Sequence, residues 1–193
     1  MNGVRGEGPR HRLLNYGLAT MPGPTDERRE LKLLKNHAEF RTSLISLTMT
    51  ADIGILEAHV YAIARKWFEL GRLHYVDGSA VDGGVNPRAV YSRAYYAAYN
   101  ASKAVRYVVS GLVSLHGDDH KKVAADLPKN FPDLDSWASK FSLLYEHRLR
   151  ADYDNWSDTS KENVLTPGDC LAIADEFLNT AEQYLLAEYG LSI

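Results

Sequence analysis

The sequence predicts an all-α fold, an up-and-down helical bundle with four main helices plus a short helix. Along several segments apolar residues recur at alternating steps of three and four, which places them on one face of a helix. Asn86-Pro87 and Thr166-Pro167 each pair a helix-capping residue with a proline suited to the first helical position. No segment alternates apolar and polar residues over the length of a useful strand. We therefore expect helices that pack on helices.

The first main helix is expected to begin at Met49. Its buried face would consist of Ile53, Leu56, Val60, Ile63, Trp67 and Leu70. Residues 76–85 contain Asp-Gly and Asp-Gly-Gly sequences and are predicted to form a loop. The second helix should run from Pro87 to about Gly111, with an alanine-rich face that lets a neighbouring helix approach closely.

Three further helices follow from start and stop signals. A shorter helix is expected within residues 116–131, bounded by prolines. Asp133 is expected to cap a helix that runs to about Asp154. The last helix has the clearest start, with Thr166 as cap, Pro167 in the first position and Asp169 in the first turn.

The chain divides into two regions, residues 1–48 and 49–193. The first 25 residues are rich in glycine and proline, a composition that buries little. A short helix is expected between residues 26 and 47, so we predict that 1–48 is an N-terminal extension, disordered or loosely helical. Whether this extension belongs to the native product stays open. Residues 49–193 would form the bundle domain.

Composition and charge narrow the class of protein. The chain has 193 residues, of which 45% are hydrophobic and 24% charged, which is ordinary for one soluble domain. A net charge of -3 gives no global reason for nonspecific nucleic-acid binding, although a local basic patch is compatible with it. A single cysteine, Cys170, excludes an intramolecular disulfide. We expect a cytoplasmic protein without a membrane span, a metal site or a cofactor.

The helix expected over residues 133–154 carries an arginine on its apolar face. Leu134, Trp137, Phe141 and Leu144 form a stripe whose next positions are Arg148 and Ala151. A guanidinium facing a core or an interface keeps its charge and needs a partner. Either an acid from another helix pairs with Arg148, or its stem packs while its head reaches water, or it binds an anion such as a phosphate. Asp152, one turn later, can orient Arg148 through an ion pair.

The second helix begins with more tyrosines than a core requires. Its face away from the alanines holds Arg93, Tyr96, Asn100 and Lys103. This face is either an amphipathic surface, on which tyrosines cover apolar neighbours and keep their hydroxyls in water, or a surface for a ligand or a second subunit.

Two segments together resemble the paired signatures of a prokaryotic branch of the HEPN family: Ser92-Arg93-Ala94-Tyr95-Tyr96-Ala97-Ala98-Tyr99 and Arg148-Leu149-Arg150-Ala151-Asp152-Tyr153. In that branch a Tyr-Tyr-Ala helix precedes a histidine, here His120, and a later helix carries an arginine followed by Ala-Asp-Tyr. The resemblance covers about residues 50 to 189.

The resemblance implies an up-and-down bundle that often dimerises, commonly beside a small nucleotidyltransferase, in toxin-antitoxin or other defence systems. Active members are metal-independent endoribonucleases in which an arginine, followed after about four to six residues by a histidine, supplies a fixed cation and a base. Here Tyr153 stands at the place of that histidine. Tyrosine has an ordinary pKa of about 10 and is a poor base at neutral pH. His147 points about 100° away from Arg148 on an ideal helix.

The candidate site follows from these segments. The candidate catalytic residues are Arg148, Tyr153 and Asp152, and the candidate substrate-binding residues are Arg93, Tyr96, Asn100, His120 and Arg150. Expected partners are a second copy of the chain, an RNA or nucleotide, and a nucleotidyltransferase protein. Three functions stay open: binding of RNA or nucleotide phosphate with cleavage of RNA, a noncatalytic dimeric module that holds a partner, and a plain helical adaptor in which Arg148 is structural.

Overall fold

A computed structural model describes residues 31–32, 34–111, 119–120, 123–154 and 165–193. These residues contain five α-helices and no β-strand: α2 (His37–Ser46), α3 (Thr50–Ser79), α4 (Pro87–Ser110), α5 (Leu134–Tyr153) and α7 (Pro167–Tyr189). The predicted all-α class is thereby confirmed. Among the described helices, none combines the length and apolarity needed to cross a bilayer.

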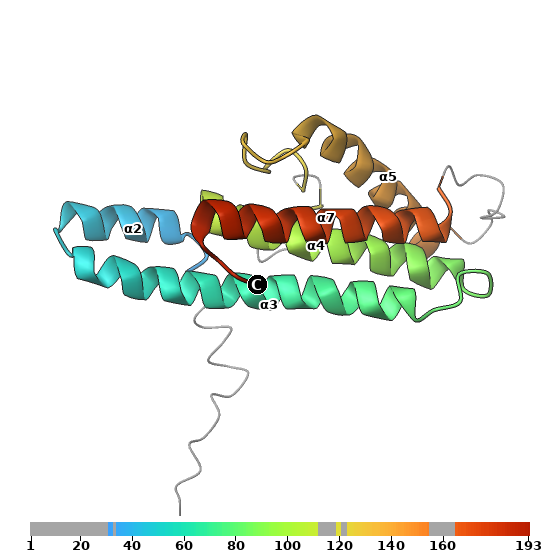
Figure 1. The fold of residues 1–193 in the computed structure, drawn as a ribbon, viewed down its shortest axis with the longest axis horizontal. Helices are drawn as coiled ribbons and strands as arrows, with labels where there is room; N and C mark the ends of the chain where they lie inside the picture. Colours follow the sequence, from blue (N-terminus) through green and yellow to red (C-terminus); the bar gives the residue numbers. More distant parts are fainter. Residues whose placement is uncertain (1–30, 33, 112–118, 121–122, 155–164) are drawn as a thin grey trace, which may run out of the picture.

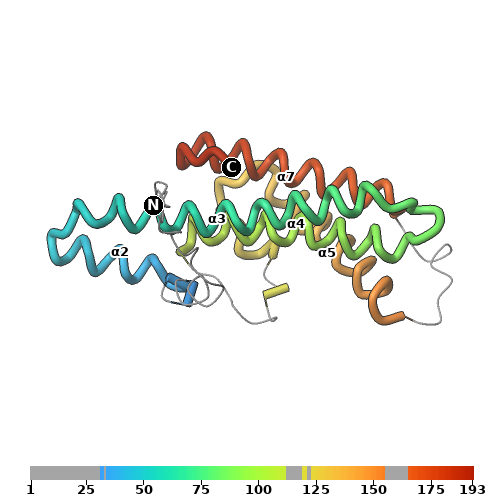
Figure 2. The backbone as a smooth tube through the Cα atoms, turned by 90° about the horizontal axis from the view of Figure 1, so that it is seen from below, coloured from blue at the N-terminus to red at the C-terminus, as the bar shows by residue number. Residues whose placement is uncertain are grey.

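Successive helices reverse direction, and α4 lies at the centre of the bundle (Figure 1). It packs against α3, α5 and α7, whereas α2 packs against the first half of α3. Seen from below, α5 leans outward from the three long helices (Figure 2). The central position of α4 brings its tyrosines next to both α3 and α5.

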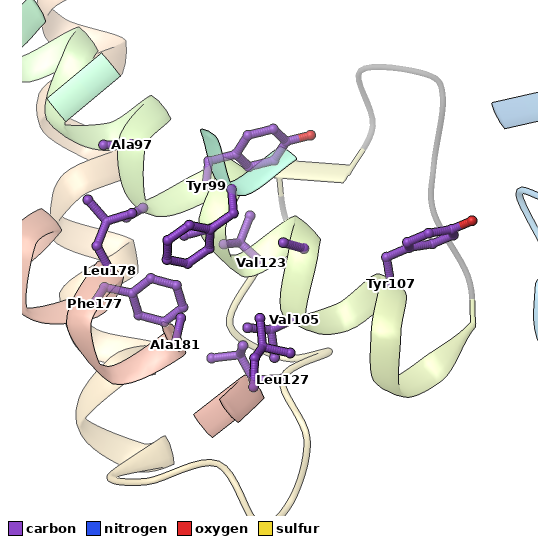
Figure 3. Close-up of a cluster of buried hydrophobic side chains, with 14 of the residues drawn as sticks. Ala97, Tyr99, Val105, Tyr107, Val123, Leu127, Phe177, Leu178 and Ala181 are labelled. Atoms are coloured by element: carbon purple, nitrogen blue, oxygen red, sulfur yellow. The ribbon is translucent and has the colours of Figure 1, made fainter. Parts of the chain in front are cut away.

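The alanines of α4 allow the close helix packing that the sequence predicts. Ala94, Ala97, Ala98, Ala101 and Ala104 are all completely buried. Opposite them, a Cβ atom on Gly71 of α3 would lie 2.8 Å from the carbonyl oxygen of Ala97, so only glycine fits there. Larger side chains from α7 and from the segment before α5 fill the remaining core (Figure 3).

The predicted helix starts are formed by local capping. The Asn86 side chain accepts a hydrogen bond from the backbone N–H of Ala89 at 3.3 Å. Thr166 Oγ1 accepts from the backbone N–H of Asp169 at 3.1 Å, and the Asp169 carboxylate accepts from the N–H of Thr166 at 2.8 Å, which completes a capping box. Asp133 stands before α5 as predicted, but its backbone is left-handed and its side chain makes no capping bond.

Two predictions are wrong: the end of the first main helix, and the short helix in the described part of its range. The helix α3 continues through Ser79, into the segment predicted as a loop, because Gly78 lies against α4 and α7. A Cβ atom there would approach Arg93 Cβ to 3.0 Å, so tertiary packing outweighs the roughly 1 kcal/mol that glycine costs a helix. Residues 123–131 form turns instead of the end of a short helix, and 116–118 and 121–122 lie outside the described residues.

The residues before α3 contact the bundle through α2. The His37 ring bonds to the carbonyl oxygen of Tyr107 on α4 at 2.8 Å, and the Tyr107 hydroxyl donates to the carbonyl of Leu34 at 3.0 Å. The short helix expected between residues 26 and 47 is α2. The prediction for residues 1–30 lies outside the described residues.

Candidate functional site

Arg148 lies near the end of α5, where that helix crosses the first half of α4. Its side chain is 11% exposed. Nη2 donates a hydrogen bond of 2.7 Å to the hydroxyl of Tyr96, and the guanidinium lies 5.4 Å from the Tyr96 ring centroid and 5.3 Å from that of Tyr153. The guanidinium therefore contacts two aromatic rings.

The acid beside Arg148 comes from its own helix. Nε lies 2.8 Å from Asp152 Oδ2, at the predicted spacing of four, but without the alignment of a hydrogen bond. The Asp152 side chain is 27% exposed. Burial alone would lower the pKa of Arg148, yet Tyr96 and Asp152 raise it overall, so the positive charge is permanent. Arg148 is a fixed cation whose carboxylate partner borders solvent.

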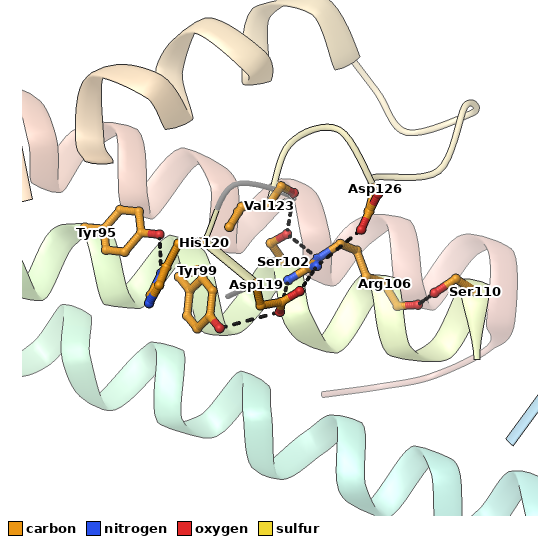
Figure 4. A network of polar contacts seen from close by, with 9 residues as sticks. All are labelled: Tyr95, Tyr99, Ser102, Arg106, Ser110, Asp119, His120, Val123 and Asp126. Carbon is orange, nitrogen blue, oxygen red and sulfur yellow. Dashed lines mark hydrogen bonds and ion pairs between the residues drawn. The ribbon is translucent and has the colours of Figure 1, made fainter. Parts of the chain in front are cut away.

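Tyr96 links Arg148 to His120, which arrives from a different segment of the chain. The Tyr96 and His120 rings have centroids 6.3 Å apart, and His120 lies 4.7 Å from the Tyr99 ring. His120 Nδ1 also shares a 2.7 Å hydrogen bond with the hydroxyl of Tyr95 (Figure 4). The fold thus brings side chains from residues 92–99 and 148–153, and the histidine between these segments, into one cluster.

The environment of His120 favours its neutral form. Burial lowers the pKa of His120 below its ordinary value, and the positive charge of Arg148 lowers it further, with partial opposition from Asp119. A neutral imidazole is available to accept a proton near pH 7. Buried Tyr95 keeps its proton, since burial raises its pKa far above the ordinary value.

A buried ion pair holds His120 against α4. Its neighbour Asp119 accepts two hydrogen bonds from Arg106, of 3.0 and 2.9 Å, and the two side chains are 4% and 6% exposed (Figure 4). Arg106 Nε also donates to Ser102 Oγ at 3.3 Å, and Ser102 donates to the carbonyl of Val123 at 2.9 Å. These bonds fix the segment before α5 on the helix that carries the tyrosines.

A cavity of about 450 Å³ opens beside this cluster, between α3, α4 and the end of α5. It is lined by His74, Arg88, Ala89, Ser92, Arg93, Tyr96 and Asp152. Arg88 donates to the carbonyls of Ala151 and Asp154, two of the groups that give the end of α5 a negative partial charge. That contact weakens the repulsion which a helix C-terminus exerts on an anion.

Five of the eight predicted site residues lie together: Arg148, Asp152, Tyr153, Tyr96 and His120. Arg93 lines the adjoining cavity. Arg150 is half-buried on α5, and its carbonyl accepts from the N–H of Asp154.

The expected polar face of α4 is only partly a surface. Asn100 is 4% exposed and donates to the Tyr96 carbonyl at 2.8 Å, and Lys103 is 7% exposed with its ammonium 4.1 Å from the Trp67 ring. Both are covered because α3 packs over this part of α4. His147, as its helical angle predicts, lies away from the cluster, stacked on Tyr91.

Sequence reasoning missed the residues that complete the site. Tyr95, Tyr99 and Tyr145 surround His120, with the Tyr145 ring stacked 6.1 Å from it. Arg106 and Ser102 stand one turn apart inside the alanine-rich helix, a polar pair that signals a buried partner. Nothing in the sequence identifies Asp119 as that partner.

No family model, curated protein or solved structure matches this chain. In the part of the chain that the structure describes, no three His, Cys, Asp or Glu side chains are grouped so as to hold a metal ion.

Proposed function

We propose that the chain is a HEPN-type protein that binds a phosphate of RNA at Arg148 and cleaves the RNA without a metal ion, with His120 as the base. One observation carries the proposal: a permanent cation and a neutral imidazole, distant in sequence, both contact Tyr96. A cation stabilises the charge that develops on phosphorus, and a base draws the proton from the attacking hydroxyl.

The proposed reaction is an internal transesterification. The step requires the His120 tautomer whose proton is on Nδ1, where it is donated to the Tyr95 hydroxyl oxygen. The ribose 2′-hydroxyl then loses its proton to His120 Nε2, and its oxygen attacks the adjacent phosphorus. The bond from phosphorus to the 5′-oxygen breaks, that oxygen takes a proton from water, and the hydroxide left behind takes the proton from His120. A cyclic phosphate and a free hydroxyl result, with Arg148 stabilising the charge in between. Tyr153 supports Arg148 through its ring and is not needed as a base.

A second candidate is a noncatalytic dimeric module, such as the partner of a nucleotidyltransferase. It is favoured by the contacts that Arg148 already has, because Asp152 and Tyr96 occupy two sides of the guanidinium in the free chain. In that case the cluster would bind a protein acid at a subunit contact instead of a phosphate.

Incubation with single-stranded and structured RNA in excess chelator separates the candidates. Cleavage by the wild-type chain, its loss in His120→Gln, and loss of binding in Arg148→Ala are the expected results. His59→Gln, on the exposed side of α3, is the matched histidine control. If RNA binding survives in Arg148→Ala, the phosphate site is excluded. If RNA binds but is not cleaved, the enzymatic part is excluded and the binding module remains.

A further inference from the structure

We propose that Arg93 and His74 form a second phosphate subsite in the cavity next to Tyr96, so that the ligand is a chain with successive phosphates instead of a mononucleotide. This inference rests on the proposed phosphate site at Arg148. It adds to that site the residues that hold the neighbouring phosphate and the direction in which the ligand extends.

Arg93 and Tyr96, the residue that contacts Arg148, lie on one face of α4. Ala89, Ser92, Arg93 and Tyr96 line the same cavity, as their helical spacing requires. Arg93 precedes Tyr96 by three residues, about 4.5 Å along the helix axis. Arg148 on α5 donates to the Tyr96 hydroxyl. A strand whose first phosphate lies at Arg148 would therefore pass Tyr96 and enter the cavity at Arg93.

Arg93 retains donors for an anion. Its side chain is 44% exposed, and its nearest carboxylate oxygen, on Asp77, is 3.8 Å away, which is a loose contact between half-exposed groups. A guanidinium has five N–H donors and binds phosphate through two of them at once. A phosphate can displace Asp77 without leaving a buried charge unpaired.

The His74 ring has its proton on the nitrogen that can donate to the same anion. Arg93 Nη1 lies 2.8 Å from His74 Nδ1, and since arginine can only donate, Nδ1 accepts and the proton of the neutral ring sits on Nε2. Burial lowers the pKa of His74, and Arg93 lowers it further. The His74 ring also lies 5.5 Å from the Tyr96 ring, next to the first subsite.

The cavity has a size and charge that fit a nucleotide unit. Its volume of about 450 Å³ falls within the range of roughly 300–1,000 Å³ usual for small-ligand sites. Arg88 and Arg93 line it on the positive side and Asp152 on the negative side, and Asp152 is already paired with Arg148.

The test compares two probes, adenosine monophosphate and a short oligoadenylate methylated at its 2′-oxygens so that it cannot be cleaved. Binding is measured by titration over a series of salt concentrations. Arg93→Gln should weaken oligoadenylate binding about three- to tenfold and reduce the slope of log K against log salt by about 0.7, the loss of one phosphate contact. Binding of the mononucleotide should weaken less than binding of the oligoadenylate, because its single phosphate occupies only one subsite at a time. Asp77→Asn should strengthen oligoadenylate binding, because it removes the competing carboxylate.

Arg72→Gln is the matched control, since it removes the same charge from the other side of α3, where Arg72 pairs with Glu182. If Arg148→Ala weakens binding of both probes while Arg93→Gln behaves like Arg72→Gln, the second subsite is excluded and the first stands. If the wild-type chain binds neither probe, or if Arg148→Ala changes neither, the proposed function fails and this inference with it.

Discussion

Two arginines pack near His120, and their partners differ. Arg106 makes two hydrogen bonds to Asp119, an acid from another segment that is 4% exposed. Arg148 bonds to a tyrosine hydroxyl and pairs with Asp152 of its own helix, which is 27% exposed. The two arginine side chains are themselves similarly buried, 6% and 11% exposed.

The comparison shows that two similarly buried arginines can differ in how exposed their carboxylate partners are. The charge of Arg106 is neutralised inside the bundle by a buried ion pair, and removal of one partner would leave the other charge buried and unpaired. The carboxylate that pairs with Arg148 is 27% exposed and lines a cavity, so water or a ligand can reach it. We expect mutations of the first to affect mainly stability and mutations of the second mainly binding.

The largest effect is expected for Arg106→Ala. The substitution leaves Asp119 buried without its partner, which should lower the free energy of unfolding by about 3–5 kcal/mol. Urea denaturation followed by circular dichroism measures the loss. The double variant Arg106→Leu with Asp119→Leu should recover a large part of it. If Arg106→Ala lowers the free energy of unfolding no more than Arg72→Ala does, the ion pair of Arg106 with Asp119 is no more important for stability than a surface ion pair.

Arg148→Ala should reverse the balance between stability and binding. The free energy of unfolding should fall by only about 1–2 kcal/mol, because one hydrogen bond and a solvent-bordering ion pair are lost. RNA binding should weaken at least about tenfold, equivalent to about 1.4 kcal/mol. Arg148→Lys keeps the charge without the planar fork and should lie in between. A drop in stability as large as that of Arg106→Ala would make Arg148 structural.

The pH dependence of His120 offers a more sensitive comparison. Its pKa is lowered in the folded chain by burial and by Arg148. Its contribution to stability is therefore fully present above the ordinary histidine pKa of about 6.5 and is lost as pH falls through the lowered value. Cleavage should decline over the same acidic range, because the protonated ring cannot act as a base.

Removal of the nearby positive charge should move this transition. In Arg148→Ala the pKa of His120 should rise, which an NMR titration of the imidazole signal measures, with His120→Gln to assign the signal. Arg72→Ala should leave it in place. An unchanged transition in Arg148→Ala would show that the two groups are not electrostatically coupled.

The smallest effect is expected for Tyr96→Phe. The ring and its contacts remain, while the hydroxyl that accepts from Arg148 is removed. We expect a change in unfolding free energy of about 0.5–1.5 kcal/mol and RNA binding weakened severalfold, since the guanidinium loses its orientation. Tyr61→Phe, whose hydroxyl makes only a long bond of 3.5 Å to Tyr189, is the control. Equal effects of the two variants would argue against a positioning role for the Tyr96 hydroxyl.

Local features of the chain could be predicted and long-range ones could not. The caps at Asn86 and Thr166 and the pair of Arg148 with Asp152 depend on residues within one or two turns, and all three are present. The end of α3 was misplaced because Gly78 is stabilised by contacts with other helices. The turns at 123–131 escaped prediction because apolar spacing within a short segment does not distinguish a helix from a buried turn.

In the candidate site, too, the local features could be predicted from the sequence and the long-range contacts could not. The arginine on an apolar face and the dense tyrosines are visible as sequence patterns. The position of His120 depends on the bond between Arg106 and Asp119, which no spacing rule connects. The lining of the cavity by His74 and Arg88 depends on how α3 and α4 pack together.

Gly71 gives that packing a particular consequence. The backbones of α3 and α4 touch at this residue, and His74 follows it by three residues, so the missing side chain at position 71 decides how near the imidazole of α3 comes to the phenol of α4. The width of the cavity is set by a residue that contributes no atom to its wall. A single methyl group there would force α3 and α4 apart and widen the cavity.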